Sequence, residues 1–306
     1  MTNSRSLHVF IVGTIAIFWA LNWPMMKIGL EVLEPWTMRA ILVLSGGVGA
    51  LAIGWLCGDS LKVPKGEIIP LLWVGLFQGL LWNGLSAFGI AYLDAGRAAV
   101  LAFTMPMWAT LLAAIFLREA ITGRAIAGLA LGMTGMALLL VPSLGTLGPA
   151  SAGALLMLAS AISWAIATII VKGTRWTISP FVLSGWQFMI GFVPLALAAV
   201  TLGDPASVLE LDARTGSAFA YSAIMPMVYC QAMFFAIVRR LPASLASMNT
   251  LLIPPLGVIF SAMVLGEHVG PLEICAVVLV VGAMVLILPG FTLRSLRIGR
   301  APSRAG

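Results

Sequence analysis

Apolar runs separated by short polar connections follow one another along almost the whole chain. A helix needs roughly 20 apolar residues to cross the hydrocarbon core of a bilayer. Ten runs meet this need, at 8–30, 36–57, 68–93, 97–117, 124–141, 151–171, 180–202, 214–238, 242–265 and 271–288. The first run lacks a small-residue cleavage site and is followed by further spans, which indicates a retained helix and not a signal peptide. The pattern therefore predicts an all-α integral membrane protein with ten transmembrane helices.

Landmark residues that recur at a fixed distance divide the chain into two related halves. Trp19, Lys27 and Pro35 return 145 residues later as Trp164, Lys172 and Pro180, and Pro106 and Glu119 return after 148 residues as Pro254 and Glu267. Each half holds an odd number of spans, so the second half enters the membrane from the opposite side, as in inverted-repeat transporters. The sequence predicts two inverted five-helix repeats over 8–141 and 151–288, followed by a basic cytoplasmic tail over 289–306.

Composition excludes several functional classes. The chain is 61% hydrophobic and 9% charged, whereas an ordinary soluble domain is about 25% charged. The net charge of +6 comes from scattered basic residues, without the basic stripe of a nucleic-acid-binding surface. Cys57, Cys230 and Cys275 lie in apolar runs and lack C-x-x-C spacing. We expect no nucleic-acid partner, no metal site and no cofactor.

The basic residues also predict the orientation in the lipid bilayer, because short cytoplasmic loops are enriched in Lys and Arg. With the N-terminus inside, 13 of the 17 basic residues fall on the cytoplasmic side. The 4 on the outer side are Lys27, Arg39, Arg97 and Arg214. Both termini are therefore expected in the cytoplasm.

Amide side chains occur near the middle of several predicted spans, where a polar group usually faces the bundle interior or a watery cavity. They are Asn22, Gln78, Asn83, Gln187, Gln231 and Asn249. Hydrogen bonding between helices is the alternative explanation for each of them alone. Gln78 and Trp82 share a helix face because they are four residues apart, and the offset of 148 places Asn83 on Gln231. These two observations favour a cavity.

Aromatic rings form a second group at membrane depth, namely Trp19, Trp82, Trp108, Trp164 and Tyr229. Packing between helices is again the alternative to ligand contact. Trp19 and Trp164 are counterparts in the two repeats, so we expect both at the interface between the halves.

Prolines inside spans predict bends, because each removes a backbone hydrogen bond. Pro106 and Pro254 occupy corresponding positions, and we expect them to help gate opposite ends of a central site.

No charged residue is expected near the centre of a span. Proton-coupled carriers commonly use a buried acid or histidine, so for a carrier this pattern favours facilitated transport at least as much as proton antiport.

The chain resembles the drug/metabolite transporter superfamily, and specifically its ten-span EamA-type members, over about residues 10–290. The matching residues are Trp19-x-x-Asn22, Lys27, Pro35 and Arg39, then GRAAVLAFTMP with Arg118-Glu119, and LPASLASMNTLLIPPLGVIFSAMVLGE in the second half. The second repeat carries Ser184 where Arg39 stands and Ala167 where Asn22 stands. Any role of Arg39 and Asn22 therefore belongs to the first half only.

The most similar members are bacterial inner-membrane exporters of amino acids and related metabolites, which include an aromatic amino-acid exporter with a central cavity. The resemblance implies a carrier in the inner (plasma) membrane that exports such molecules by alternating access. It implies a substrate site at Trp19, Asn22, Gln78, Trp82, Trp108, Trp164, Tyr229 and Asn249. The rings and amides fit a zwitterion with an apolar or aromatic side chain. Lys27 is either a further carboxylate partner or a surface lysine near Glu31.

Other functions are weighed against this hypothesis. An exporter of broad specificity for drugs or metabolites would use the same aromatic walls. A channel-like pore would favour a repeated ring of charges or carbonyls, which the inverted duplication does not predict. An enzyme needs convergent reactive groups, whereas His8 and His268 lie near opposite ends of the chain. Transport is therefore favoured over catalysis, and the sequence leaves open whether the chain forms a homodimer.

Overall fold

The computed structural model of the chain describes residues 2–116, 123–144, 148–234 and 243–287, and these ranges are helical without a strand. The first half contains α1 (Thr2–Gly29), α2 (Pro35–Leu56), α3 (Lys65–Val74), η1 (Gly75–Trp82), α4 (Asn83–Tyr92), α5 (Ala95–Ala102), α6 (Met105–Phe116) and α7 (Gly123–Leu144). The second half contains α8 (Pro149–Gly173), α9 (Pro180–Leu202), η2 (Pro205–Glu210), α10 (Ala213–Ile224), η3 (Met225–Cys230), α12 (Ala243–Leu265) and α13 (Pro271–Ile287). Arg118, Glu119 and the expected tail 289–306 lie outside the described residues.

The ten predicted spans are confirmed. The expected ends that fall on described residues agree with the helix ends within three residues, except that α1 extends back to Thr2. The expected end of the eighth span at 238 and the expected start of the ninth at 242 lie outside the described residues. Five segments of the described chain are each long and apolar enough to cross a bilayer, namely Pro35–Leu56, Lys65–Tyr92, Ala95–Phe116, Pro149–Gly173 and Pro180–Leu202. Large apolar side chains such as Val200 and Met263, 72% and 76% exposed, lie on outward faces. In a bilayer these faces contact lipid.

Short local signals determine where several helices begin. Pro35, Pro149 and Pro180 occupy the first turns of α2, α8 and α9, where the missing N–H of proline costs nothing. The carboxylate of Glu34 accepts hydrogen bonds from the first N–H groups of α2, and the Ser179 hydroxyl does the same for α9. These caps satisfy donors that a helix start otherwise leaves free.

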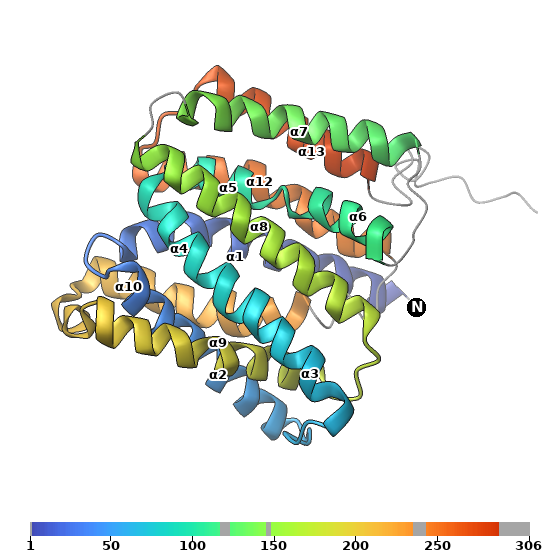
Figure 1. Cartoon of the computed structure of the whole chain (residues 1–306), viewed down its shortest axis with the longest axis vertical. Helices are drawn as coiled ribbons and strands as arrows, with labels where there is room; N and C mark the ends of the chain where they lie inside the picture. The colour runs from blue at the N-terminus through green and yellow to red at the C-terminus, as the bar shows by residue number, and fades with distance from the viewer. Residues whose placement is uncertain (1, 117–122, 145–147, 235–242, 288–306) are drawn as a thin grey trace, which may run out of the picture.

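Each repeat packs against the other through counterpart helices (Figure 1). The pair α2 and α9 lies at one end of the long axis of the molecule, and the pair α7 and α13 lies at the other end. Along α2 and α9 the neighbours are Gly47 with Met189, Leu51 with Gly185, and Gly54 with Phe181. The numbers rise on one helix and fall on the other, so the helices are antiparallel. Antiparallel counterparts require a two-fold axis perpendicular to the helices, which is the geometry of inverted repeats.

The offset between corresponding residues of the two repeats changes from 145 to 148, and this change has a local origin. Helix α9 has 23 residues and α2 has 22. The connection 203–212, which contains η2, is two residues longer than the connection 57–64. The insertion therefore lies before the third span, and the later helices of the two repeats keep a constant offset.

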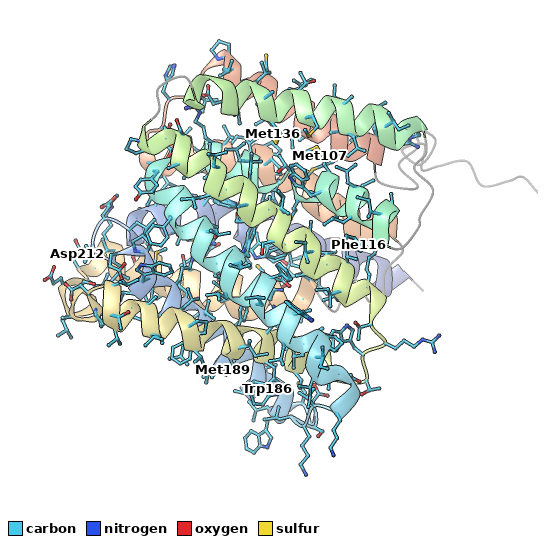
Figure 2. The ribbon with its side chains drawn as sticks, viewed as in Figure 1. Met107, Phe116, Met136, Trp186, Met189 and Asp212 are labelled. Atoms are coloured by element: carbon cyan, nitrogen blue, oxygen red, sulfur yellow. The ribbon has the colours of Figure 1, made fainter. Side chains whose placement is uncertain are left out.

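Glycines allow the closest helix contacts. A Cβ on Gly191 of α9 would overlap the backbone of Gly79 in η1, and a Cβ on Gly79 would overlap the carbonyl of Gln187. Small residues allow such approach in membranes, where packing replaces the hydrophobic effect as the driving force between helices. Met107 of α6 and Met136 of α7 are buried near the α7–α13 pair, on its side towards the rest of the bundle (Figure 2).

The third span of each repeat contains a π-helical segment, which the hydrophobic pattern does not predict. Segment η1 covers 75–82 and η3 covers 225–230, so the two lie at counterpart positions under the offset of 148. Pro226 lies inside η3, where a bend was expected. The α-helix also breaks between Ala102 and Met105, just before Pro106. Helix α12, in contrast, continues through Pro254 as one element.

Candidate functional site

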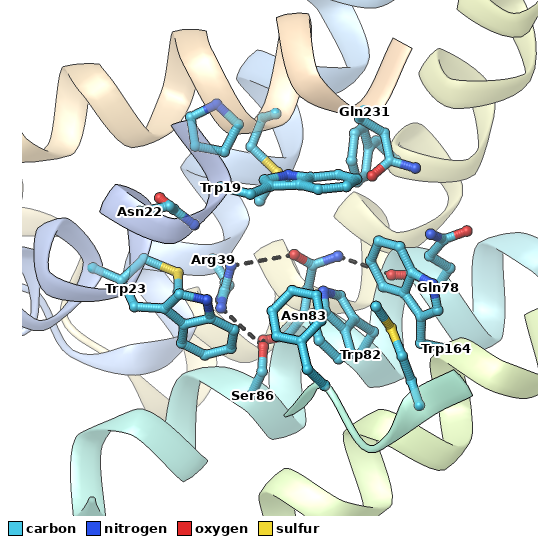
Figure 3. A pocket seen from close by; sticks show the side chains of 16 residues that line it. Trp19, Asn22, Trp23, Arg39, Gln78, Trp82, Asn83, Ser86, Trp164 and Gln231 are labelled. Atoms are coloured by element: carbon cyan, nitrogen blue, oxygen red, sulfur yellow. Dashed lines mark hydrogen bonds between the residues drawn. The ribbon is translucent and has the colours of Figure 1, made fainter. Parts of the chain in front are cut away.

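A cavity lies at the centre of the bundle, between the two repeats (Figure 3). Its free volume is about 60 Å³, enough for a few water molecules and far below the 300 Å³ or more of a typical ligand pocket. The lining residues are Trp19, Asn22, Trp23, Met26, Arg39, Gln78, Trp82, Asn83, Ser86, Phe103, Met105, Trp164, Phe188, Pro226, Met227 and Gln231. The cavity must enlarge before it can hold an amino acid.

Indole rings from both repeats form one wall of this cavity. The ring centroids of Trp19 and Trp164 are 6.1 Å apart, and those of Trp82 and Trp164 are 4.6 Å apart, both with edge-to-face geometry. Such pairs contribute about 0.5–1.5 kcal/mol beyond simple burial. Trp19 and Trp164 therefore meet between the halves, where their repeat correspondence predicted them.

A charged side chain, Arg39, lines the cavity, which corrects the expectation that no charge lies near the middle of a span. Arg39 is 2% exposed, and its guanidinium donates hydrogen bonds to Asn83 Oδ1 at 3.3 Å and Ser86 Oγ at 2.9 Å. Its backbone lies only four residues into α2, about 6 Å along the helix. Asn83, however, lies nine residues before the end of α4, about 14 Å along that helix. The long side chain thus carries its charge towards the middle of the membrane.

The π-helical turn of the first repeat is stabilised by one amide side chain. Asn83 Nδ2 donates to the carbonyl oxygens of Gln78 and Gly79 at 2.9 and 3.0 Å. A π turn leaves carbonyls without their usual partners, and such turns are frequent at functional sites. Asn83 therefore has two roles, because its Oδ1 also accepts from Arg39. Gln231 holds the counterpart position next to η3.

Several polar atoms around the cavity are buried without a hydrogen-bond partner among the described residues. They include Asn22 Oδ1, Arg39 Nε and Gln231 Nε2. A buried polar atom without a partner costs about 1–3 kcal/mol, so clusters of them indicate bound water or a ligand. The three come from α1, α2 and the eighth span and line the same cavity.

Two further predicted site residues, Trp108 and Tyr229, lie outside the cavity lining. Trp108 Nε1 donates to Thr104 Oγ1 at 3.3 Å, and the Tyr229 hydroxyl lies 2.9 Å from Thr14 Oγ1. Asn249 belongs to α12, but its side chain lies outside the described part of the chain. The cavity brings together the other predicted site residues apart from Lys27, namely Trp19, Asn22, Gln78, Trp82 and Trp164.

Lys27 also lies apart from the cavity. Its Nζ donates to the carbonyl oxygens of Ile90, Ala91 and Leu93 at 2.8, 3.2 and 2.6 Å. Ile90 and Ala91 lie in the last turn of α4 and Leu93 follows its end, where carbonyl oxygens have no further helical N–H groups from which to accept. Lys27 therefore caps a helix of its own repeat, a role that neither of the two sequence-based interpretations included.

A carboxylate from the second repeat caps the next helix at the same end of the bundle. Glu267 accepts hydrogen bonds from the backbone N–H groups of Ala95 at 2.6 Å and Gly96 at 2.9 Å, at the start of α5. Nearby, Arg97 pairs with Glu273 at 3.3 Å. We call Lys27, Arg97, Glu267 and Glu273 the end cluster. It ties the loop between α12 and α13 to the first repeat.

A buried aromatic cavity between two inverted helical repeats is an arrangement typical of membrane transporters of small molecules. The sequence matches the EamA-like transporter family twice, over residues 7–141 and 151–288. The chain belongs to this family.

Individual relatives are similar along nearly the whole chain. An uncharacterized protein of Pseudomonas aeruginosa is 32% identical over 87% of this chain and 95% of its own length. A protein of Salmonella typhimurium, named a probable amino-acid metabolite efflux pump, is 24% identical over 93% of this chain and 96% of its own. A crystal structure of a protein with 18% identity covers 95% of this chain and 99% of its own, with a TM-score of 0.69. The last likeness concerns the fold alone.

Proposed function

We propose that the chain is an inner-membrane carrier that exports amino acids or related small metabolites with apolar or aromatic side chains. The observation that carries the proposal is the contact between Trp19 and Trp164, one ring from each repeat, in the wall of the central cavity. A site shared by two inverted repeats suits a carrier whose halves rock around it. The efflux activity named for the Salmonella relative agrees with the outward direction.

Alternating access requires that each mouth of the cavity open in turn. The break between α5 and α6 supports a hinge beside Pro106, because Phe103 and Met105 line the cavity directly. Pro254 is the counterpart in the second repeat and is assigned the same task at the opposite mouth. With both termini in the cytoplasm, the end cluster closes the outer mouth. Crosslinks that lock one mouth are expected to abolish transport, and undiminished flux through a locked protein would indicate a channel.

Transport by purified protein in liposomes tests the proposal. Vesicles are loaded with tryptophan, phenylalanine, threonine or a lipophilic cation, and efflux is measured for each compound. Amino-acid flux at carrier rates is expected, with loss of at least tenfold in Trp164→Ala and Asn22→Ala. Trp55→Ala is the matched control, since Trp55 is 67% exposed and lies on an outward face.

The competing functions predict other results in the same experiment. Efflux of the cation without amino-acid flux would favour the exporter of broad specificity. Ion currents would favour a pore. Unchanged amino-acid flux in both cavity variants, with normal folding, would show that the site is wrong.

A further inference from the structure

The proposed function leaves open what holds the substrate in place, and the charge in the cavity bears on this question. Among the described residues that line the cavity, Arg39 carries a charge and the others are uncharged. Arginine stays protonated in proteins, and a buried charge without a partner is strongly unfavourable. No carboxylate of the described residues lies within ion-pair distance of Arg39. The protein therefore holds a cation at its centre without a described counter-ion.

The guanidinium has hydrogen-bonding capacity to spare. It offers five N–H donors, and the described residues accept from Nη1 and Nη2, through Asn83 and Ser86. Nε is buried and has no partner among them. Asn83 is in turn fixed by the carbonyls of the π-helical turn. Arg39 is thus held in one orientation, with unused donors, at a cavity that must open to accept a ligand.

We infer that Arg39 is the anchor for the carboxylate of the substrate, and that the site selects α-amino acids as zwitterions. Arginine recognises carboxylates through parallel N–H···O bonds, which are strongest away from water. The ammonium group then requires an acceptor, and Asn22 Oδ1 is a buried acceptor without a described partner on the same lining. Figure 3 shows Asn22 and Trp23 of α1 on the same side of the cavity as Arg39. Indole faces attract a cation as well.

This arrangement belongs to the first repeat alone. At the counterpart of Arg39 the second repeat carries Ser184, which is fully buried and uncharged. The apolar side chain of the substrate then faces the remaining lining, where Trp82, Trp164 and Met227 lie. A single anchor gives the substrate one orientation. The inference rests on the proposed function and adds the chemical class that the site selects.

Binding of matched acid and amide pairs tests the anchor. Purified protein in detergent is titrated with L-tryptophan and L-tryptophanamide, and with L-threonine and L-threoninamide, and Kd is measured by ligand-induced thermal stabilisation. The titrations are run at about pH 6, below the pKa of an α-amino group next to an amide. The amide then keeps the ammonium and the side chain but lacks the negative charge. Because hydrogen bonds to charged groups are strong, at least one acid is expected to bind about 10- to 100-fold more tightly than its amide.

The variants separate an anchor from a structural brace between α2 and α4. Arg39→Gln is expected to bring the ratio of the two Kd values to within about twofold of one, while Arg39→Lys keeps a preference for the acid because it keeps the charge. Arg175→Gln removes an exposed charge outside the cavity and is expected to leave the ratio unchanged. A purely structural arginine would lower thermal stability in Arg39→Gln without changing the ratio.

Three results would overturn the inference. Equal binding of acid and amide to the wild-type protein excludes an anchor without any variant, so the test holds even where Arg39→Gln does not fold. An unchanged ratio in folded Arg39→Gln excludes Arg39 as its source. Binding of none of the four compounds overturns the proposed function itself, and the inference with it.

Discussion

Glu267 offers a sharp test of how the two repeats are held together. Its carboxylate reaches from the loop after α12 to the first two N–H groups of α5, at 2.6 and 2.9 Å. The change Glu267→Gln keeps the length and one carbonyl oxygen but removes the charge and one acceptor. The N–H groups of Ala95 and Gly96 are expected to lose most of their protection against hydrogen exchange.

The size of this effect follows from the geometry. A hydrogen bond to a charged group contributes about 1.5–3 kcal/mol, and negative charge at a helix N-terminus adds about 0.3–1 kcal/mol. Glu267 is partly exposed, and solvent screening favours the lower part of these ranges. A loss of about 1.5–3 kcal/mol corresponds to exchange that is roughly 10- to 100-fold faster at the two amides.

Exchange measured by mass spectrometry on peptides that cover 93–100 checks this prediction. Glu31→Gln is the control, because it removes a carboxylate that pairs with exposed Arg214 away from α5. Protection in the control is expected to equal that of the wild-type protein. Unchanged exchange at Ala95 and Gly96 in both Glu267→Gln and Glu267→Ala would refute the assignment of Glu267 as a cap that joins the repeats.

Three further predictions concern packing, orientation and pH. Gly191→Ala forces a methyl group against the backbone of η1 and is expected to lower the unfolding free energy by about 1–3 kcal/mol, measured by denaturant titration. Gly66→Ala in α3 meets open space and is expected not to destabilise, because alanine is favoured over glycine in a helix. Single cysteines at Lys62 and Asp212 are expected to label from the cytoplasm and from outside respectively, and the reverse result would refute the orientation. Hydrogen bonds from Thr215 lower the pKa of the Asp212 carboxyl. The stability that this carboxylate gives to the start of α10 is therefore fully present above the ordinary pKa of Asp and is lost as the pH falls through the lowered pKa. On acidification the thermal midpoint is expected to fall more in the wild-type protein than in Asp212→Asn.

Much of the fold could be predicted because lipid makes a simple demand on sequence. A span must be apolar over its length and must satisfy its own backbone, which leaves a clear pattern. The repeat correspondence added long-range information, and it placed Trp19 and Trp164 together although they are 145 residues apart. The same comparison of repeats paired Asn83 with Gln231, and both line the cavity.

The parts that could not be predicted depend on contacts between distant backbone atoms and on side-chain reach. The distribution of basic residues assigns Arg39 to the outer side, because the sequence gives the position of its Cα and not the direction in which a long side chain extends. Lys27 pairs with carbonyls 63 to 66 residues away, and backbone acceptors have no sequence signature. The π-helical turns likewise follow from packing, since Gly75 and Gly79 lie against α9.

The fixed charge of Arg39 has an electrical consequence. In the proposed alternating-access cycle the two mouths of the cavity open in turn. The guanidinium then stays in place while the water that contacts it changes from one side of the membrane to the other. A charge that passes in this way through the full membrane potential changes free energy by about 2.3 kcal/mol per 100 mV. With the cytoplasm negative, the potential favours the inward-open state of the empty carrier in this proposed cycle, which is the state that would load cytoplasmic substrate. The transport rate should therefore depend on voltage even for a substrate without net charge.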